Sequence, residues 1–481
     1  MGIERVPDDV MFLVLRNIAC GRSYGLRGWK RKLGILGVCR RWRALAQRQA
    51  FDDIYVESYE AGNRRLKTNI GLCAAAGSPI TGSAKRKRLT LLIENGAGSL
   101  EAAIASVLTV LEPHARLISE VGELRIEFSG CPCLPPSSRG RQQQRRRRST
   151  LHTVLGIIDL GNQLARLASH ATALRFRLGK ADRGATLFGH VVVRHFAKRL
   201  VHLDTNTAMS LPDPGGFQGR RLALHTNVEG VRLHVQPRIE PRLLESLHLS
   251  WIDYRFDWRV FLSKADSESM VDFARLRELV VEPSTASVRG PTNMLPGYLT
   301  SVKIRAPALQ RVYAEATPLS CLLLWTMHMP QTLESVWLDC ADGATLVLRS
   351  VDAPRLQAAV HKYAMRRMGA AVGGIELAND VLGGAGCRVA GHSSLRILGG
   401  AAESCGEGGG LLGLRRWTHL DSLELRARVS WVALREILVR APHLAELKAH
   451  CVVDVPPGAA VDAEWHVVQG TRIRRAWLRL G

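Results

Sequence analysis

One short pattern recurs along the chain and constrains its fold more than any other feature. It reads apolar-x-x-apolar-x-apolar, where x is any residue, as in Leu244-x-x-Leu247-x-Leu249 and Leu276-x-x-Leu279-x-Val281. Its last two apolar residues alternate with other residues, which is typical of a half-buried β-strand. Further copies are Leu200-x-x-Leu203, Leu309-x-x-Val312-x-Ala314, Leu333-x-x-Val336-x-Leu338, Leu395-x-x-Leu398, Leu420-x-x-Leu423-x-Leu425, Leu444-x-x-Leu447-x-Ala449 and Ile473-x-x-Ala476-x-Leu478.

Segments of helical spacing alternate with strands in the first part of the chain. Residues 100–111 and 151–167 carry apolar residues three and four positions apart, whereas residues 89–93, 124–128 and 174–178 alternate. The repeat intervals are looser than those of a regular leucine-rich repeat but of the right order, and the pattern resembles a degenerate form of it. The resemblance implies an α/β fold, an irregular solenoid with a parallel sheet on its concave face and helices on its convex face. The alternative is an ordinary α/β domain with coincidental leucine-rich strands.

Several copies of the pattern are preceded by similar residues, which lead into the expected strand. Proline there has no N–H to donate and stops a preceding helix, so each helix is expected to end just before its strand. These leading segments are Phe273-Ala-Arg-Leu276, Ala306-Pro-Ala-Leu309, Met329-Pro-Gln-Thr-Leu333, Ala353-Pro-Arg-Leu356 and Ala441-Pro-His-Leu444.

The residue between the last two apolar positions of each strand is expected on the open, concave side. This set is basic and aromatic with one acid, a composition suited to anchoring a partner and to pairing carboxylates or phosphates. A protein bound there is therefore expected to present an acidic or phosphorylated segment. The alternative is a solvated face that only keeps the protein soluble. The candidates for the substrate-binding face are Arg125, Arg175, His202, His248, Tyr313, Trp337, Lys448 and Trp477, with Val280 and Glu424 at equivalent positions.

The first fifty residues have a different pattern. Pro7 suits the first position of a helix, and Asp8 and Asp9 place negative charge in its first turn, so a helix is expected to begin there. A second helical stripe spans Ile35 to Ala46, with arginines on its polar side. Such short helices bury too little surface to be stable alone, and they require a neighbour or a partner.

This segment resembles the F-box, which begins with Leu-Pro, continues with apolar pairs and ends in Val-Cys-Arg-x-Trp. The matching positions are Val6, Pro7, Val10, Met11, Val14, Leu15, Ile18, Leu36, Val38, Cys39 and Trp42. The resemblance implies that these residues dock the small Skp-type adaptor of a cullin-type ubiquitin ligase while the rest of the chain holds a protein substrate. The segment between Cys20 and Lys32 is longer and more basic than the usual F-box loop. The alternative is an ordinary helical hairpin packed on the body of the protein.

Net charge suggests a second kind of partner. The chain has a formal charge of +23, much of it in runs such as Lys85–Arg88 and Arg141–Arg148. The second run lies in an insertion at about 132–149 that is rich in Pro, Gln and Arg and is expected to be disordered. Basic runs of this kind favour nuclear import or nucleic-acid binding, although most are simply solvated. A basic solenoid that binds nucleic acid, or that acts as a non-catalytic interaction scaffold, is therefore the alternative to the ligase subunit.

Nothing in the sequence favours an enzyme. Gly408-x-Gly410-x-x-Gly413 lacks the strand before it that a dinucleotide site needs, and Gly21-Arg-Ser23-Tyr-Gly25 follows a helix, unlike a nucleophile elbow. No metal or cofactor is expected, and the scattered cysteines are typical of buried residues in a reducing compartment. We therefore expect a protein of the cytoplasm or nucleus without membrane attachment, with a docking module at 1–50 and a solenoid at 51–481.

Overall fold

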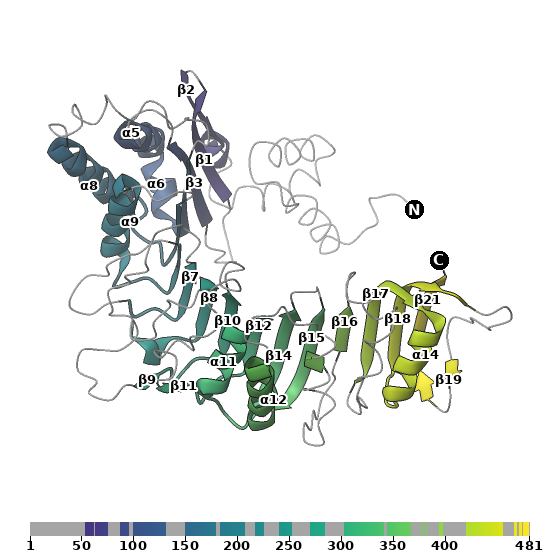
Figure 1. Ribbon diagram of the computed structural model, residues 1–481. Coiled ribbons are helices and arrows are strands. Elements are labelled where there is room, and N and C mark those ends of the chain that lie inside the picture. Colours follow the sequence, from purple (N-terminus) through teal and green to yellow (C-terminus); the bar gives the residue numbers. More distant parts are fainter. Residues whose placement is uncertain are drawn as a thin grey trace, which may run out of the picture. The chain divides into compact units, whose positions relative to one another are not determined.

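The computed structural model describes residues 53–61, 63–75, 87–95, 100–130, 150–178, 183–206, 217–225, 240–252, 270–283, 303–340, 344–366, 377–378, 381, 394–397, 420–455, 466–468, 471–473 and 475–480. The chain separates into two compact units, residues 1–219 with 228–236 and residues 220–227 with 237–481. The structure is mixed α/β, with a large, mostly parallel sheet and several helices (Figure 1). The expected boundary at residue 50 and the insertion at 132–149 lie outside the described residues.

In the first unit the strands lie in the order β2-β1-β3-β4-β5-β6. All neighbours are parallel except β1 and β2, which are antiparallel because a single residue separates them in the chain. The elements are β1 (Asp53–Ala61), β2 (Asn63–Thr68), α4 (Ile70–Ala75), β3 (Lys87–Asn95), α5 (Leu100–Leu111), η2 (Glu112–His114), α6 (Ala115–Ser119), β4 (Val121–Gly130), α8 (Thr150–Leu167), β5 (Ala173–Leu178), α9 (Arg183–Phe196) and β6 (His202–Thr205).

Alternation of residue type decides which side of this sheet is covered. On β5, Leu174, Phe176 and Leu178 are buried, while the residues between them are partly exposed. The Phe176 ring lies 5.7 Å from that of Phe128 on β4 and directly beneath α9, where a Cβ on Gly189 would lie only 2.5 Å from its Cζ. Burial of each large apolar side chain contributes about 1.5–3 kcal/mol. The apolar side of the sheet is thus fixed against the helices, and the polar side chains are left on the other side.

In the second unit the strands lie in the order β7-β8-β10-β12-β14-β15-β16-β17-β18-β21. The elements are β7 (Arg221–His225), η5 (Pro241–Leu243), β8 (Ser246–Ile252), β9 (Met270–Asp272), β10 (Glu278–Pro283), β11 (Lys303–Arg305), β12 (Arg311–Ala316), α11 (Pro318–Thr326), β13 (Met327–His328), β14 (Thr332–Cys340), β15 (Thr345–Asp352), α12 (Ala353–Arg366), β16 (Ser394–Ile397), β17 (Ser422–Ser430), α14 (Trp431–Arg440), β18 (Glu446–Val453), β19 (His466–Val468), β20 (Thr471–Ile473) and β21 (Arg475–Leu480).

Short strands replace helices in part of this unit. β9, β11 and β13 form a separate parallel sheet, and each leads through a corner into β10, β12 or β14. The corners stack through backbone hydrogen bonds, from Phe273 N–H to the Arg305 carbonyl and from Ala306 N–H to the His328 carbonyl, both 2.8 Å. The prediction that a helix ends just before the strand is therefore wrong at Phe273 and Ala306, which directly follow β9 and β11. At Met329 a helix does precede the strand, because α11 ends at Thr326, but β13 lies between them. The prediction holds at Ala441, which directly follows α14.

Two further features differ from the sequence-based expectation. Pro354 lies in the first turn of α12 rather than after a helix, a position where its missing N–H has no intrahelical acceptor. β15 runs antiparallel to both β14 and β16. Only four residues separate β14 from β15, too few for the crossover that a parallel neighbour requires.

Candidate functional site

The candidate site is the side of the sheet that carries partly exposed side chains, here called the strand face. Register places the expected residues beside one another within each unit. Arg125 pairs with Arg175 in the first unit, and Glu424, Lys448 and Trp477 follow one another in the second. The longest row in the second unit consists of His248, Val280, Tyr313 and Trp337. Their shared face was predictable from the repeated pattern, and their role in binding stays a prediction.

On β6 the residue in register with the predicted row is not the predicted one, and the role of His202 in binding stays a prediction. His202 pairs with Ala173, whereas Asp204 is the residue opposite Arg175. The pattern at Leu200-x-x-Leu203 has no third apolar residue, because Thr205 occupies that place. Asp204 therefore does not lie between two apolar residues, and the pattern does not mark it as a residue of the strand face. The row in the first unit therefore contains an acid where a histidine was expected.

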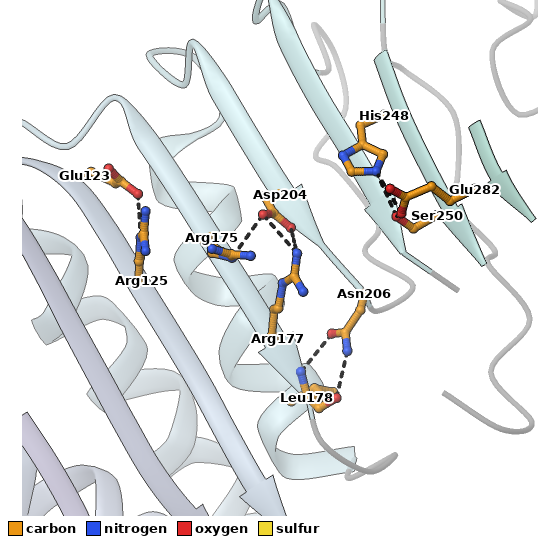
Figure 2. A network of polar contacts seen from close by, with 10 residues as sticks. All are labelled: Glu123, Arg125, Arg175, Arg177, Leu178, Asp204, Asn206, His248, Ser250 and Glu282. Carbon is orange, nitrogen blue, oxygen red and sulfur yellow. Dashed lines mark hydrogen bonds and ion pairs between the residues drawn. The ribbon is translucent and has the colours of Figure 1, made fainter. Parts of the chain in front are cut away.

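Glu123 on β4 connects two arginines of the first unit. Its Oε2 lies 3.0 Å from Arg88 Nε on β3. Its Oε1 accepts a hydrogen bond of 2.6 Å from Arg125 Nε, as Figure 2 shows. Burial tends to raise the pKa of Glu123, but the hydrogen bond and charge of Arg125, together with Arg88, outweigh it and hold the pKa below its usual value. The carboxylate is therefore ionised and fixes both guanidinium groups.

Asp204 on β6 holds a second pair of arginines in the same way. Arg175 Nε lies 3.0 Å from Asp204 Oδ2, and Arg177 Nη2 donates to both carboxylate oxygens at 3.2 Å. Next to this group, the Asn206 side chain accepts from the backbone N–H of Leu178 and donates to its carbonyl, both at 2.7 Å. These bonds continue the pairing of β5 with β6 beyond the end of β6. Figure 2 shows the two carboxylates facing their arginines on the same side of the strands.

Each of these carboxylates is shared by two arginines, so each group keeps a formal charge of +1. An arginine has five N–H donors, and one carboxylate engages only part of the fork. The guanidinium groups are partly exposed, with side-chain exposures of 16% for Arg125 and 28% for Arg175. Such preorganised guanidinium groups are suited to a carboxylate or phosphate of a partner, since little side-chain entropy remains to be lost on binding.

In the second unit, His248, Ser250 and Glu282 form a compact hydrogen-bonded group. The Ser250 hydroxyl donates to Glu282 Oε2 at 2.7 Å and accepts from His248 Nε2 at 2.9 Å, and the same nitrogen lies 3.3 Å from Glu282 Oε2. The His248 hydrogen bond is the main cause that lowers the pKa of Glu282 to about 2; burial opposes it, and Ser250 and the nearby His225 assist.

This group contains the residue types of a hydrolase triad but not its arrangement. In a triad the imidazole accepts the serine proton and the carboxylate binds the opposite ring nitrogen. Here the Glu282 carboxylate accepts the hydrogen bond of the Ser250 hydroxyl directly. The same nitrogen of His248, Nε2, contacts both Ser250 and Glu282. The geometry does not activate Ser250 as a nucleophile. The absence of enzymatic activity remains a prediction.

Comparison of the chain with protein-family models, with curated proteins and with solved structures gave no match. The function of the strand face therefore has to be inferred from its own geometry.

A row of acids in the second unit was missed by sequence reasoning. Glu282, Glu315 and Asp339 lie on β10, β12 and β14, two residues beyond Val280, Tyr313 and Trp337 in the chain; Glu315 pairs in register with Asp339, and the charge of Glu282 acts on Glu315. Residues two positions apart on a strand share a face, so the signal is present in the alternation. The repeated pattern marks only one residue per strand as belonging to the strand face, the one between the last two apolar positions. Those residues are mostly basic or aromatic, so the pattern alone predicts a largely basic strand face.

The expected docking residues from Val6 to Trp42 lie outside the described part of the chain. Cys321 and Cys340 are buried, as the sequence indicated, and burial raises the pKa of the Cys321 thiol to about 12. Among the described residues, no group of three or more His, Cys, Asp or Glu side chains is placed to hold a metal ion. Within the part of the chain that the structure describes, no helix is long and apolar enough to cross a membrane.

Proposed function

We propose that the protein is the substrate-recognition subunit of a cullin-type ubiquitin ligase. In this proposal the F-box-like helices dock the Skp-type adaptor, and the strand face binds a protein client. The observation that carries it is the combination of the Val38-Cys39-Arg40-Arg41-Trp42 ending with a parallel ladder of aligned leucine-type positions behind it. The N-terminal segment alone does not indicate that the protein binds a client, and the parallel strands alone do not indicate a connection to a ligase.

The ladder supports client binding for a physical reason. Neighbouring strands are spaced by about 4.8 Å, so equivalent side chains form straight rows on a rigid backbone. Leu279, Val312 and Val336 are buried beneath the row of the second unit and hold it in place. A partner then meets side chains of fixed position, which favours specific recognition. The leucine-rich-repeat-like solenoid is part of the same proposal.

The direct test concerns the adaptor. Leu15→Asp and Trp42→Asp each place a charge on the apolar side of a predicted docking helix, and burial of an unpaired charge is strongly unfavourable. We expect either substitution to abolish co-purification with the Skp-type adaptor. Arg43→Asp, on the expected polar side, is the matched control and should keep binding. Adaptor binding that survives both Leu15→Asp and Trp42→Asp would contradict the proposal.

A basic scaffold that binds nucleic acid is the second candidate. It is favoured by the formal charge of +23 and by the arginine groups around Glu123 and Asp204. Phosphate contacts release counterions, so such binding weakens steeply as salt rises. Filter binding over a salt series separates the two functions: a steep slope that is lost in Arg125→Gln and Arg175→Gln variants supports the scaffold.

A further inference from the structure

Two aromatic side chains lie side by side on the strand face of the second unit. Tyr313 on β12 pairs in register with Trp337 on β14, and their ring centroids are 6.4 Å apart. Trp337 is 44% exposed, although the residues on either side of it along the strand pack into the core at Val336 and Leu338. Exposed tryptophan and tyrosine on a rigid element are the residues that most often dominate binding energy at an interface.

Three carboxylates border these rings at the carboxyl ends of the strands. Register places Glu315 directly opposite Asp339. Glu282 lies one residue beyond the last residue of β10 that pairs with β12, close enough for its charge to act on Glu315. The Tyr313 hydroxyl donates to Asp339, and Ser250 donates to Glu282. Glu315 has no lysine or arginine partner among the residues that the structure describes. We call Glu282, Glu315 and Asp339 the acidic row.

The acidic row is electrostatically unfavourable in the isolated protein. Burial raises the pKa of Glu315, and the charges of Glu282 and Asp339 raise it further. Like charges on adjacent strands destabilise a sheet by about 0.2–1 kcal/mol for each pair. At the other end of the same strands the charges are balanced, because Glu278 lies opposite Arg311 in register. His248 and Ser250 stabilise the ionised form of Glu282, so the uncompensated negative charge lies at Glu315 and Asp339, at the strand ends beside the two rings.

We propose that this aromatic and acidic surface binds a lysine- or arginine-rich segment of a protein partner. The aliphatic stem of one basic side chain lies across Trp337 and Tyr313, and its cation faces Glu315 and Asp339. An aromatic ring attracts a cation over its face, and a guanidinium also pairs with carboxylates, so the same side chain satisfies both features. The inference rests on the proposed use of the strand face for client binding, and it is independent of adaptor docking.

The choice of a basic partner follows from charge complementarity. An acidic or phosphorylated segment, which the arginines of the first unit favour, would be repelled by Glu282, Glu315 and Asp339. A single-stranded nucleic acid stacks on aromatic rings, but its phosphates would meet the same repulsion. A basic segment removes the repulsion at Glu315 when it binds. Its cation replaces an unfavourable interaction of the free protein with a favourable one.

The test uses the full chain and a fluorescent peptide of alternating arginine and serine, with binding measured by anisotropy at low ionic strength. We expect Trp337→Ser to weaken binding about tenfold, since an interfacial tryptophan typically contributes more than about 1 kcal/mol. Glu315→Gln should weaken it about threefold to fivefold. Glu278→Gln, on the same face at the balanced end of β10, is the matched control and should change binding by less than about twofold.

Glu315→Gln also separates a binding role from a structural one. The substitution keeps the shape of the side chain and removes the repulsion, so the variant should unfold at a temperature higher by about 2 °C while binding the peptide less tightly. Peptide binding that is unchanged in both Trp337→Ser and Glu315→Gln would overturn the inference. So would an absence of peptide binding, or binding of a glutamate–serine peptide or an oligothymidylate that is lost in Trp337→Ser. Adaptor co-purification by the same variants reports on the proposed function separately.

Discussion

Replacement of Asp204 by asparagine tests how far the strand face of the first unit depends on its shared carboxylates. Asp204 is only 12% exposed at its side chain and holds Arg175 and Arg177 at 3.0 and 3.2 Å. Asparagine has the same shape and keeps one carbonyl oxygen, so the substitution removes charge with little change in packing. The two arginines on β5 would then lie close together without a neutralising group.

The expected cost is obtained from the contacts. A hydrogen bond to a charged group contributes about 1.5–3 kcal/mol and a neutral one about 0.5–1.5 kcal/mol. The difference is about 1 kcal/mol for each arginine, and water screens part of it because both guanidinium groups are about 30% exposed. Arg177 makes hydrogen bonds to Asp204, whereas Arg175 is held by an ion-pair contact alone. We therefore expect Asp204→Asn to destabilise the region of β5 and β6 by about 1–2 kcal/mol.

Hydrogen exchange of the full chain, followed at the amides of β5 and β6, measures this loss locally. A change of about 1–2 kcal/mol corresponds to a roughly fivefold to thirtyfold loss of protection. Asp159→Asn, at an exposed acid on α8 of the same unit, is the control and should leave protection unchanged. A loss below about threefold for Asp204→Asn, or an equal loss in the control, would refute the argument that the carboxylate holds both arginines.

Two further predictions concern packing and pH. Gly189→Ala places a Cβ 2.5 Å from the Phe176 ring and should destabilise the first unit by about 1–3 kcal/mol in urea titrations, whereas Gly71→Ala, with open space around it, should not. Glu282 has a pKa lowered to about 2, and that of Glu123 is lowered as well, so both carboxylates stabilise the fold above the ordinary value of about 4.3 and lose this contribution as pH falls through the folded value. Thermal unfolding from pH 6 to pH 2 should therefore show a shallower acid-induced loss in Glu282→Gln than in the unchanged protein, and identical profiles would count against the pairing with His248.

The strand positions could be predicted from the sequence because their pattern has a period of two. Leu174, Phe176 and Leu178 alternate with arginines, so only one face of the strand can be packed against the core if all three are to be buried. The same alternation predicts that Tyr313 and Trp337 occupy equivalent places on the strand face, and their pairing in register confirms it. Most copies end with two apolar residues at the same spacing, so equivalent positions can be identified by counting.

The features that were missed have equally physical causes. β9, β11 and β13 are only two or three residues long, too short for periodicity to reveal, and the prolines at the corners that follow two of them are equally typical of a helix end. The shared carboxylates Glu123 and Asp204 were missed because partners on neighbouring strands are set by register, which a single strand pattern does not contain. The acidic row was missed because the repeated pattern marks only one position on each strand, and these acids lie two residues further on; they reverse the expected charge of part of the strand face.

The central claim is that one chain connects a ligase adaptor to a client through separate surfaces. Affinity purification of the full chain, in parallel with a variant lacking residues 1–50 and with the Trp337→Ser variant, tests it most directly when bound proteins are identified by mass spectrometry. We predict that the deletion loses only the adaptor and that Trp337→Ser loses only a client with a basic segment. Recovery of the adaptor without residues 1–50, or loss of both partners in Trp337→Ser with the fold intact, would contradict this division.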